Sequence, residues 1–452
     1  MTTKPLDLSA ASESSSTTNS DCWSAVFSGQ NESSPIHDLR CRAFAQFQKV
    51  GFPTLKDEQW RATSVKSLVK TTFAASIGKT PTLTRDQISG YTLNQTDCHE
   101  FVFINGRFVP ELSDGKGVSG GVVMTSLSQM LRDDPDTVRE LIDRDIESQE
   151  CFTALNTAFL EEGAYIRIPQ NLKVEKPIHL LHLTVPTDDP IATHPRTILI
   201  ADSFSEATII ETHAALEDGI YLTNTVTDVV VSENANINHL FVQQQSNQAF
   251  HVSGLRVTME QHSTYTGHSF AIGGMLVRNN IDGILDGENI NATFNGLTLT
   301  RGTQHIDNHL RIDHLKPHGN SWEYYKGILD DQSRQVFSGR IFVEEDAQKT
   351  DAKQTNSNLL LTTEGHVDTR PQLEIFADDV KCTHGATIGQ LEESQLFYLQ
   401  ARGIPTAAAR SMLVFAFANE VIELVPVEEI RGRLHEILLK RLPQGELLLG
   451  GL

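Results

Sequence analysis

The spacing of apolar residues divides the chain into three regions, of which the first, residues 35–164, is mixed and mostly helical. After Pro35, apolar residues recur at the helical period, and this predicts a helix that closes at Gly51-Phe52-Pro53. The recurring positions are Leu39, Ala43, Phe44 and Phe47. The other predicted elements are a helix over Thr54–Lys70, a strand at Phe101–Ile104 ending in Asn105-Gly106, and helices near Ser126–Leu131, Pro135–Ile146 and Cys151–Glu162.

The second region, residues 165–388, alternates short β-rich runs with Asn, Asp and Gly turns. Several runs carry a glutamate at regular spacing, namely Glu206, Glu233, Glu260 and Glu288, which are 27, 27 and 28 residues apart. Glu345 follows 57 residues later, so a missing copy is expected near Lys316–Asn320. A fixed period is typical of stacked repeats, and a repeat made only of strand and turn favours a parallel β-helix. An antiparallel sandwich with chance spacing is the alternative.

The third region, residues 389–452, returns to helical patterns. Three helices are predicted, over Glu392–Ala401, Thr406–Leu424 and Val427–Leu442, the last with an apolar stripe. At the other end, residues 1–34 contain ten serines and a single basic residue, Lys4. This composition predicts a disordered tail, without the apolar core of a signal peptide or the arginines of a transit peptide.

Charge and cysteine content narrow the class of protein. With 37 basic and 58 acidic residues, the formal net charge is −21. That charge argues against nucleic acid and against an anionic membrane surface as partners. The five cysteines form no CxxC pair, so neither a disulfide framework nor a structural zinc site is indicated. No apolar run approaches the ~20 residues that span a bilayer. We expect a cytoplasmic protein.

The candidate ligand or catalytic side chains lie in the segment Gln372–Ile404. Cys382 and His384 are two residues apart there, in a predicted strand that turns through Gly385 and Gly389 into a helix. Residues i and i+2 of a strand share a face, about 6–7 Å apart. A thiol and an imidazole so placed could bind a soft metal or form a nucleophile–base pair. They could also be a small apolar residue and a hydrogen-bonded imidazole of the last coil.

The same segment carries a family resemblance. The runs DAKQTNSNLLL (351–361), PQLEIFADDVKCTHGATIGQL (371–391) and FYLQARGI (397–404) resemble the SufD subunits of the SufBCD iron–sulfur cluster assembly complex. Further similar runs are GFPTLKDEQWR (51–61), FVFINGRF (101–108), FTALNTAF (152–159) and YYKGILDDQSRQVFSGRIFV (324–343). SufB-type members have a glutamate after the histidine of the motif, where this chain has Gly385.

The resemblance implies a mainly β fold, a right-handed parallel β-helix core flanked by N-terminal and C-terminal helical domains. It implies a non-catalytic scaffold that pairs with SufB through the β-helix and docks the ATPase SufC through the C-terminal helices, around Arg402–Leu424. It also implies that His384 and, less strongly, Cys382 contribute to an iron or cluster site at the SufB–SufD interface. An iron–sulfur cluster takes about four protein ligands, so no cofactor is expected to bind tightly to the isolated chain.

Several alternatives stay open on the sequence. A carbohydrate-active β-helix enzyme would need Asp378 and Asp379 as an acid/base pair, but adjacent strand residues point to opposite faces. A Cys–His hydrolase, a purely structural interaction protein and a homodimer in place of the SufB pair are the others. The histidine-rich run over residues 304–319 is interpreted as a polar row on the β-helix surface, not as a metal site.

Overall fold

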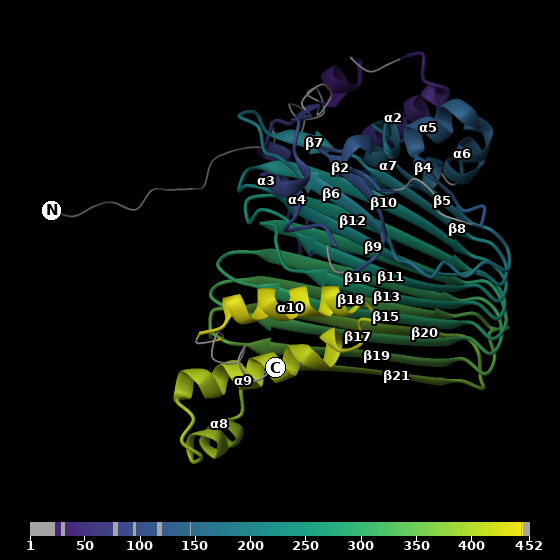
Figure 1. Cartoon of the computed structure of the whole chain (residues 1–452). Coiled ribbons are helices and arrows are strands. Elements are labelled where there is room, and N and C mark those ends of the chain that lie inside the picture. The colour runs from purple at the N-terminus through teal and green to yellow at the C-terminus, as the bar shows by residue number, and fades with distance from the viewer. Residues whose placement is uncertain are drawn as a thin grey trace.

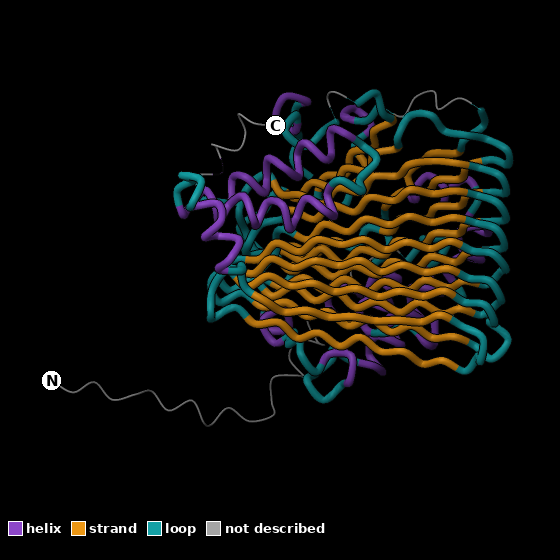
Figure 2. The backbone as a smooth tube through the Cα atoms, turned by 90° about the horizontal axis from the view of Figure 1, so that it is seen from below, coloured by secondary structure: helices purple, strands orange, loops and turns teal. Residues whose placement is uncertain are grey.

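The protein is a parallel β-helix with helices at both chain ends, seen here in a computed structural model (Figure 1). The structure describes residues 23–28, 32–75, 80–93, 96–114, 120–144, 146–443 and 445. The chain passes alternately between two sheets that face each other (Figure 2). Apart from two antiparallel pairs at the N-terminal end, each strand pairs in parallel with the strand of the next coil. The predicted mainly β fold with a parallel β-helix core is therefore confirmed, and the antiparallel sandwich is wrong.

The two sheets contain 11 and 10 strands within the described residues. The first sheet contains, in order, β20 (His366–Ile375), β18 (Arg334–Val343), β16 (His305–His314), β14 (Leu276–Leu285), β12 (Phe250–Met259), β10 (Tyr221–Val231), β8 (Arg196–Ala201), β5 (Gly163–Ile168) and β4 (Val123–Ser126). Two short strands, β7 (Ile191–Thr193) and β1 (Ala74–Ala75), join this sheet at one side. The second sheet runs β21 (Lys381–Gly389), β19 (Asp351–Leu360), β17 (Asn320–Leu329), β15 (Asn291–Thr300), β13 (Thr264–Ala271), β11 (Asn236–Gln244), β9 (Glu206–Ala215), β6 (Ile178–Thr184), β2 (His99–Ile104) and β3 (Arg107–Phe108).

The predicted repeat corresponds to a column of stacked turns. In each turn one residue has a positive φ, and its N–H donates to a carbonyl of the next coil's turn. These residues are Phe204, Asn234, His262, Asn289, His318 and Lys349. The missing copy expected near Lys316–Asn320 is the turn at His318. The glutamates lie in or beside these turns but at different positions, since Glu233 precedes the positive-φ residue and Glu206 follows it. The predicted period of the coils is therefore right, whereas the prediction that the glutamates occupy equivalent positions in successive coils is wrong.

The helix predicted after Pro35 is confirmed as α2 (His37–Val50), which ends at Gly51 with φ +68°. The strand and turn predicted near residue 101 are also confirmed, because β2 leads through Asn105 and Gly106 into β3. Other helices before the β-helix are α4 (Arg85–Ile88), η2 (Pro110–Leu112), α5 (Leu127–Asp133), α6 (Pro135–Ile142), η3 (Ile146–Ser148) and α7 (Cys151–Ala158). Strands β2, β3 and β4 extend the two sheets, so this region also caps the first coils.

The long helix predicted over Thr54–Lys70 is wrong. Only the short elements η1 (Glu58–Trp60) and α3 (Lys66–Lys70) form there. The side chain of Asp57 accepts from the N–H of Thr54 at 2.6 Å, which fixes a turn in place of a helix start. Trp60 is 4% exposed and packs on Phe152, so tertiary contact decides the path of this segment.

The tail predicted to be disordered falls partly outside the described residues, which omit 1–22 and 29–31. Residues 23–28 form a helix, and this part of the prediction is wrong. Trp23 is 4% exposed and packs edge-on against Phe159 and His194. Composition alone could not reveal this contact, because the residues that receive the indole ring come from distant parts of the chain.

The C-terminal helices are α8 (Glu393–Gln400), α9 (Thr406–Ile422) and α10 (Glu428–Arg441), close to the predicted bounds. Val414 and Val421 of α9 and Leu434 of α10 join a buried cluster with residues of the second sheet. Helices α9 and α10 therefore cover the outer face of that sheet (Figures 1 and 2). No helix of the described residues is both long enough and apolar enough to cross a membrane.

Candidate functional site

Cys382 and His384 lie on β21, the terminal strand of the second sheet, as predicted for their segment. Gly385 continues this strand, so the turn expected there is wrong, and the chain leaves the strand only after Gly389. In the parallel register, Cys382 is opposite Ala352 and His384 is opposite Gln354. Both partners are buried inside the β-helix. Since paired residues of a parallel ladder share a face, Cys382 and His384 belong to the inward-facing row of the last coil.

No further coil of the described chain covers the two side chains. His384 is exposed, whereas Cys382 is half-buried because it packs against the buried cluster that includes Ile341, Ala352 and Ala377. Burial and the nearby Asp351 raise the pKa of the Cys382 thiol, although the backbone N–H of Ala352 opposes the rise. Among the described residues no hydrogen bond joins Cys382 to His384. A nucleophile–base pair needs that bond and an acidified thiol, so the geometry argues against a Cys–His hydrolase.

Beneath His384, the inward row continues with Gln354 and then Glu323 on successive coils. The Gln354 Nε2 donates to Glu323 Oε2 at 2.6 Å. Glu323 is 1% exposed, and burial raises the pKa of its carboxyl to about 8, only partly opposed by the Gln354 amide. The side chains beneath His384 are therefore polar but uncharged at neutral pH.

The last coil leaves both sheets open. Strands β20 and β21 each pair on one side only within the described chain. Three large apolar side chains of this coil are exposed: Ile375 at 38%, Phe376 at 61% and Ile388 at 49%. Long edge strands with exposed apolar residues are rare in isolated proteins because they invite pairing. This end of the β-helix is therefore suited to contact another chain.

The C-terminal helices divide into a docked part and an exposed part. On β17, Lys326 donates to Glu420 of α9 at 2.6 Å and to the Phe417 carbonyl at 2.9 Å. Helix α8 has no buried residue, and it exposes Phe397 at 72% and Tyr398 at 58%. The apolar stripe predicted for the last helix is thus core packing, whereas α8 presents aromatic rings to solvent.

Comparison with known proteins adds two matches to family models. Residues 25–180 match the SufBD protein N-terminal region, and residues 184–417 match the SufBD core domain of the SUF system for FeS cluster assembly. The chain belongs to the SufBD family. It is accordingly an iron–sulfur cluster assembly protein, and the resemblance inferred from the sequence motifs is confirmed.

Individual SufBD relatives span nearly the whole chain. The chain is 33% identical to the iron–sulfur cluster assembly protein SufD of Escherichia coli over 402 residues, which cover 88% of this chain and 92% of that protein. It is 32% identical to an iron–sulfur cluster assembly SufBD family protein of Synechocystis over 420 residues, 91% of this chain and 92% of the relative. Identity to the chloroplastic protein ABCI7 of Arabidopsis thaliana is 32% over 412 residues, 89% of this chain and 85% of the relative.

Other residues singled out in the sequence have structural partners in this SufBD chain. His305 contacts the Thr63 hydroxyl at 2.9 Å, and His318 is an exposed turn residue. His314 is buried and bonds to Ser321 at 2.9 Å, so the interpretation of the run as a surface row is wrong there. Burial lowers the pKa of His314 to about 4.

Asp378 and Asp379 lie in the turn between β20 and β21, and not within a strand as the argument against an acid/base pair assumed. Asp379 forms an ion pair with Lys349 of the preceding coil's turn. Its carboxylate is thus engaged in holding two stacked turns together. The turn placement removes the argument from strand geometry, but the ion pair still argues against the carbohydrate-active alternative.

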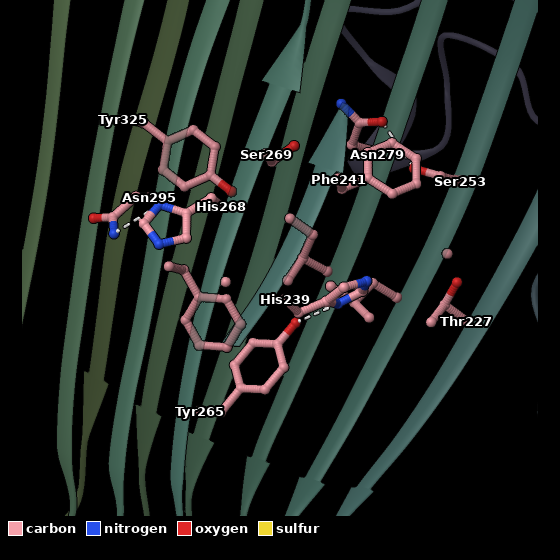
Figure 3. Close-up of a pocket in the computed structure, with 15 residues that line it drawn as sticks. Thr227, His239, Phe241, Ser253, Tyr265, His268, Ser269, Asn279, Asn295 and Tyr325 are labelled. Carbon is pink, nitrogen blue, oxygen red and sulfur yellow. Dashed lines mark hydrogen bonds between the residues drawn. The ribbon is translucent and has the colours of Figure 1, made fainter. Parts of the chain in front are cut away.

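The interior of the SufBD β-helix is partly polar, a feature that the sequence patterns did not predict. A cavity of about 30 Å³ lies between the sheets and is lined in part by His239, Tyr265, His268, Asn279 and Asn295 (Figure 3). Its polar groups bond in pairs, for example His239 Nδ1 with the Tyr265 hydroxyl at 2.8 Å. A cavity of this size has room for one or two waters. The sequence does contain polar residues at alternate strand positions, such as Glu211 and His213, and these could have indicated a polar interior. The alternation does not say, however, which row of side chains points inward.

Proposed function

We propose that this SufBD chain is a non-catalytic scaffold subunit of the SufD type. It pairs with SufB through the open end of the β-helix, docks the ATPase SufC through the C-terminal helices, and contributes His384 and Cys382 to a shared iron or cluster site. One observation carries the proposal. The two side chains occupy the inward row of a strand that no further coil covers, so a second chain can reach them.

The ligand count requires a second chain. An iron–sulfur cluster is held by about four protein ligands, and strand β21 offers one imidazole and one thiol. The cluster or iron is therefore cargo of the complex and not a resident cofactor of this chain. His384 is the principal ligand in this proposal because it is exposed. Cys382 joins once a metal draws off the proton that burial holds on the thiol.

Pairing with SufB uses strands β20 and β21. Their free edges supply backbone donors and acceptors, and Phe376 and Ile388 supply apolar surface. A related β-helix placed edge to edge would continue both sheets and bring its own inward row next to His384. A second copy of this chain satisfies the same geometry, so a homodimer is the expected state without SufB.

Docking of SufC uses the exposed aromatic rings of α8, next to the predicted surface around Arg402–Leu424. Phe397→Ala together with Tyr398→Ala should abolish co-purification of SufC while the chain stays folded, because neither ring is buried. Phe204→Ala is the control, since Phe204 is 53% exposed in a turn of the β-helix. Undiminished SufC binding by the double variant would refute this assignment.

The ligand role is tested on the complex. The chain is co-expressed with SufB and SufC, the complex is purified and reconstituted with iron and sulfide, and cluster content is read from absorbance and iron analysis. His384→Ala should lose most of the cluster, whereas Thr383→Ala, which changes the outward-facing neighbour, should load like wild type. Pull-down confirms that both variants still form the complex. Wild-type loading by His384→Ala would remove His384 from the mechanism.

A further inference from the structure

A second group of potential metal ligands lies inside the β-helix, far from the last coil. His182 of β6 is in register with His213 of β9, and Glu211 is on the same face of β9 as His213. All three side chains are buried, at 6%, 0% and 0% exposure for His182, His213 and Glu211. Six strand steps of ~4.8 Å separate β9 from β21, so the group lies roughly 29 Å from Cys382 and His384.

The ligand atoms of this group are close, and the ring nitrogens of its two histidines lack other partners in the described structure, whereas Glu211 accepts from the Thr227 hydroxyl at 3.0 Å through Oε1 and at 3.2 Å through Oε2. One nitrogen or carboxylate oxygen from each residue lies within 4.8 Å of the others. Glu211 Oε2 is 3.8 Å from His213 Nε2, which is too long for a hydrogen bond but close to the separation of two ligands of one ion. Neither ring nitrogen of His182 or of His213 has a hydrogen-bond partner in the described structure. Four buried polar atoms left in this way are costly.

The carboxylate of Glu211 also lacks a cationic side chain beside it within the described residues. The Glu211 carboxylate is buried without an Arg or Lys partner in the described part of the chain, unlike the buried Asp307, which pairs with Arg278 at 2.5 Å. Burial favours the neutral acid, but the imidazoles of His213 and His239 outweigh it and hold the pKa of Glu211 below its ordinary value. A cation bound beside Glu211 would take the place that Arg278 has beside Asp307.

His239 bridges Glu211 and Tyr265 through its two ring nitrogens. Its Nε2 lies 3.0 Å from Glu211 Oε1 and its Nδ1 lies 2.8 Å from the Tyr265 hydroxyl. Burial keeps the Tyr265 hydroxyl protonated by raising its pKa. That hydroxyl donates to Nδ1, and Nε2–H then donates to the carboxylate, so both nitrogens of neutral His239 are satisfied. His239 is therefore not counted among the candidate metal ligands.

We propose that His182, Glu211 and His213 form a binding site for one divalent transition-metal ion. Two imidazoles and one carboxylate form a ligand set suited to Zn²⁺ and to Fe²⁺. An ion there would neutralise Glu211 and occupy the unpartnered lone pairs of both histidines.

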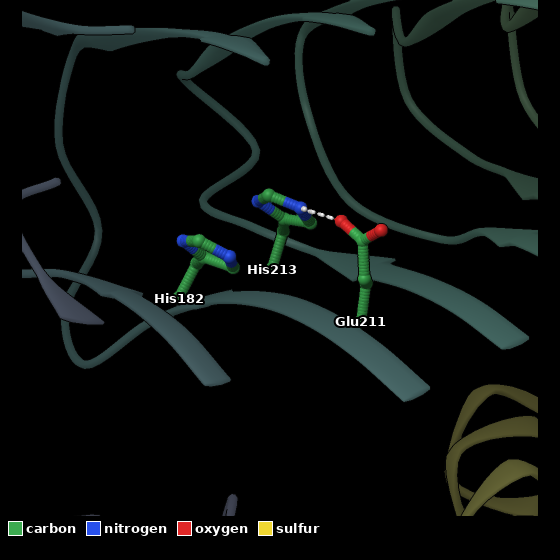
Figure 4. Close-up of side chains that lie close together, drawn as sticks. All are labelled: His182, Glu211 and His213. Atoms are coloured by element: carbon green, nitrogen blue, oxygen red, sulfur yellow. Dashed lines mark ion pairs between the residues drawn. The ribbon is translucent and has the colours of Figure 1, made fainter. Parts of the chain in front are cut away.

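The ring orientation sets one condition on binding. His182 and His213 stack with centroids 4.6 Å apart and planes 4° from parallel, and Glu211 lies beside His213 (Figure 4). The lone pairs of stacked rings run parallel, so His182 must tilt toward an ion held by the other two residues. Rotation of an imidazole about χ2 has a broad, shallow profile, and this tilt is therefore inexpensive. Without an ion, the same rings simply extend the stack that begins at Phe103.

The test uses the full-length chain, with metal content as the readout. The chain is purified from zinc-supplemented cells and analysed for metal, then stripped with chelator and titrated with Zn²⁺, with Co²⁺ as a visible probe and with Fe²⁺ under anaerobic conditions. We expect one equivalent of ion, and a Co²⁺ spectrum without thiolate charge transfer that persists in Cys382→Ser. If the three ions compete equally, the site binds divalent transition-metal ions as a class. If one ion binds more tightly than the others, the site is selective for that ion.

Two variants each remove a proposed ligand atom but keep a side chain of similar size. Glu211→Gln keeps the side-chain shape, and His182→Phe keeps a ring stacked on Phe103. Each should weaken binding by more than the roughly 10- to 100-fold seen when an outer partner of a metal site is lost. His314→Gln, a buried histidine at the other end of the β-helix, is the matched control and should bind like wild type. Thermal unfolding verifies that each variant is folded.

The proposal is overturned if the wild-type chain binds no stoichiometric ion by any of these routes, or if folded Glu211→Gln and His182→Phe bind as well as wild type. It is also overturned if the Co²⁺ spectrum depends on Cys382. A negative result leaves the interface proposal intact, because that proposal depends on residues of β21 and on cluster content of the complex. The two proposals therefore fail separately.

Discussion

Replacing Glu323 with glutamine tests whether a neutral carboxyl lies beneath the candidate site. Glu323 is 1% exposed on β17, and its only hydrogen bond in the described structure comes from Gln354, directly under His384 in the inward row. The second carboxylate oxygen, Oε1, has no partner. Glutamine has nearly the shape of the protonated acid and cannot ionise, so Glu323→Gln isolates the free energy of ionising this side chain.

The magnitude follows from the pKa. Burial raises the pKa of Glu323 from 4.5 to about 8, so the folded chain holds a proton that the unfolded chain releases above pH 4.5. Unfolding then releases a proton between these two values, and stability falls as pH rises through that window. Each pKa unit corresponds to ~1.4 kcal/mol, so wild type should lose about 3–4 kcal/mol relative to Glu323→Gln between about pH 5 and pH 8. Below the window the two proteins should be nearly equally stable.

Urea unfolding of both proteins at about pH 5, 6.5 and 8, followed by circular dichroism, measures this difference. Glu345→Gln, in an exposed turn, controls for the loss of one acidic side chain and should show a small difference that does not change with pH. A constant difference between wild type and Glu323→Gln across the series would refute the reasoning. It would mean that the carboxyl has a charged partner or a path to water.

Three further predictions test the framework of the site. Arg278→Met should destabilise the fold by about 3–5 kcal/mol in urea unfolding, because it leaves Asp307 buried and unpaired, and adding Asp307→Leu should recover part of that loss. Gly163→Ala should lower stability by at least ~3 kcal/mol, seen as a drop in Tm, since φ is +153° and the new Cβ would lie 1.8 Å from the Arg196 carbonyl oxygen; an unchanged Tm would contradict it. Iodoacetamide should alkylate Cys382 in the isolated chain more slowly than a free thiol at neutral pH, because burial raises the pKa of Cys382 and the thiolate is the reactive form; rapid reaction would revive the hydrolase alternative.

The sequence predicted the coil period because the period is a local property. Each coil needs two strands and two turns, and the turns favour residues that tolerate a positive φ, such as Asn234 and Asn289. The glutamates that revealed the period are not equivalent in space. They lie in the same turns because exposed turns accept charged residues at several positions.

The interior chemistry was not predictable in the same way. Strand β19, with the sequence DAKQTNSNLL, has an inward row that includes Gln354, Asn356 and Asn358, and its polarity resembles that of a surface row. Most of the partners of these amides are polar residues on other strands: Asn358 accepts from Gln335 of the opposite sheet at 3.1 Å, and Gln354 donates to Glu323 of the preceding coil at 2.6 Å. These two pairs join residues 23 and 31 positions apart, and no local pattern contains them.

The amino-acid sequence by itself determined the strands, their period and the common face of Cys382 and His384, because side-chain direction in a strand alternates with a fixed period of two. Only the tertiary structure decided which face is inward, which coil is the last, and that Trp23, Glu211 and His213 are buried. Those outcomes depend on contacts between segments distant in the chain. Burial, the pKa shifts that follow from it, and the open end that exposes His384 exist only once the coils are stacked.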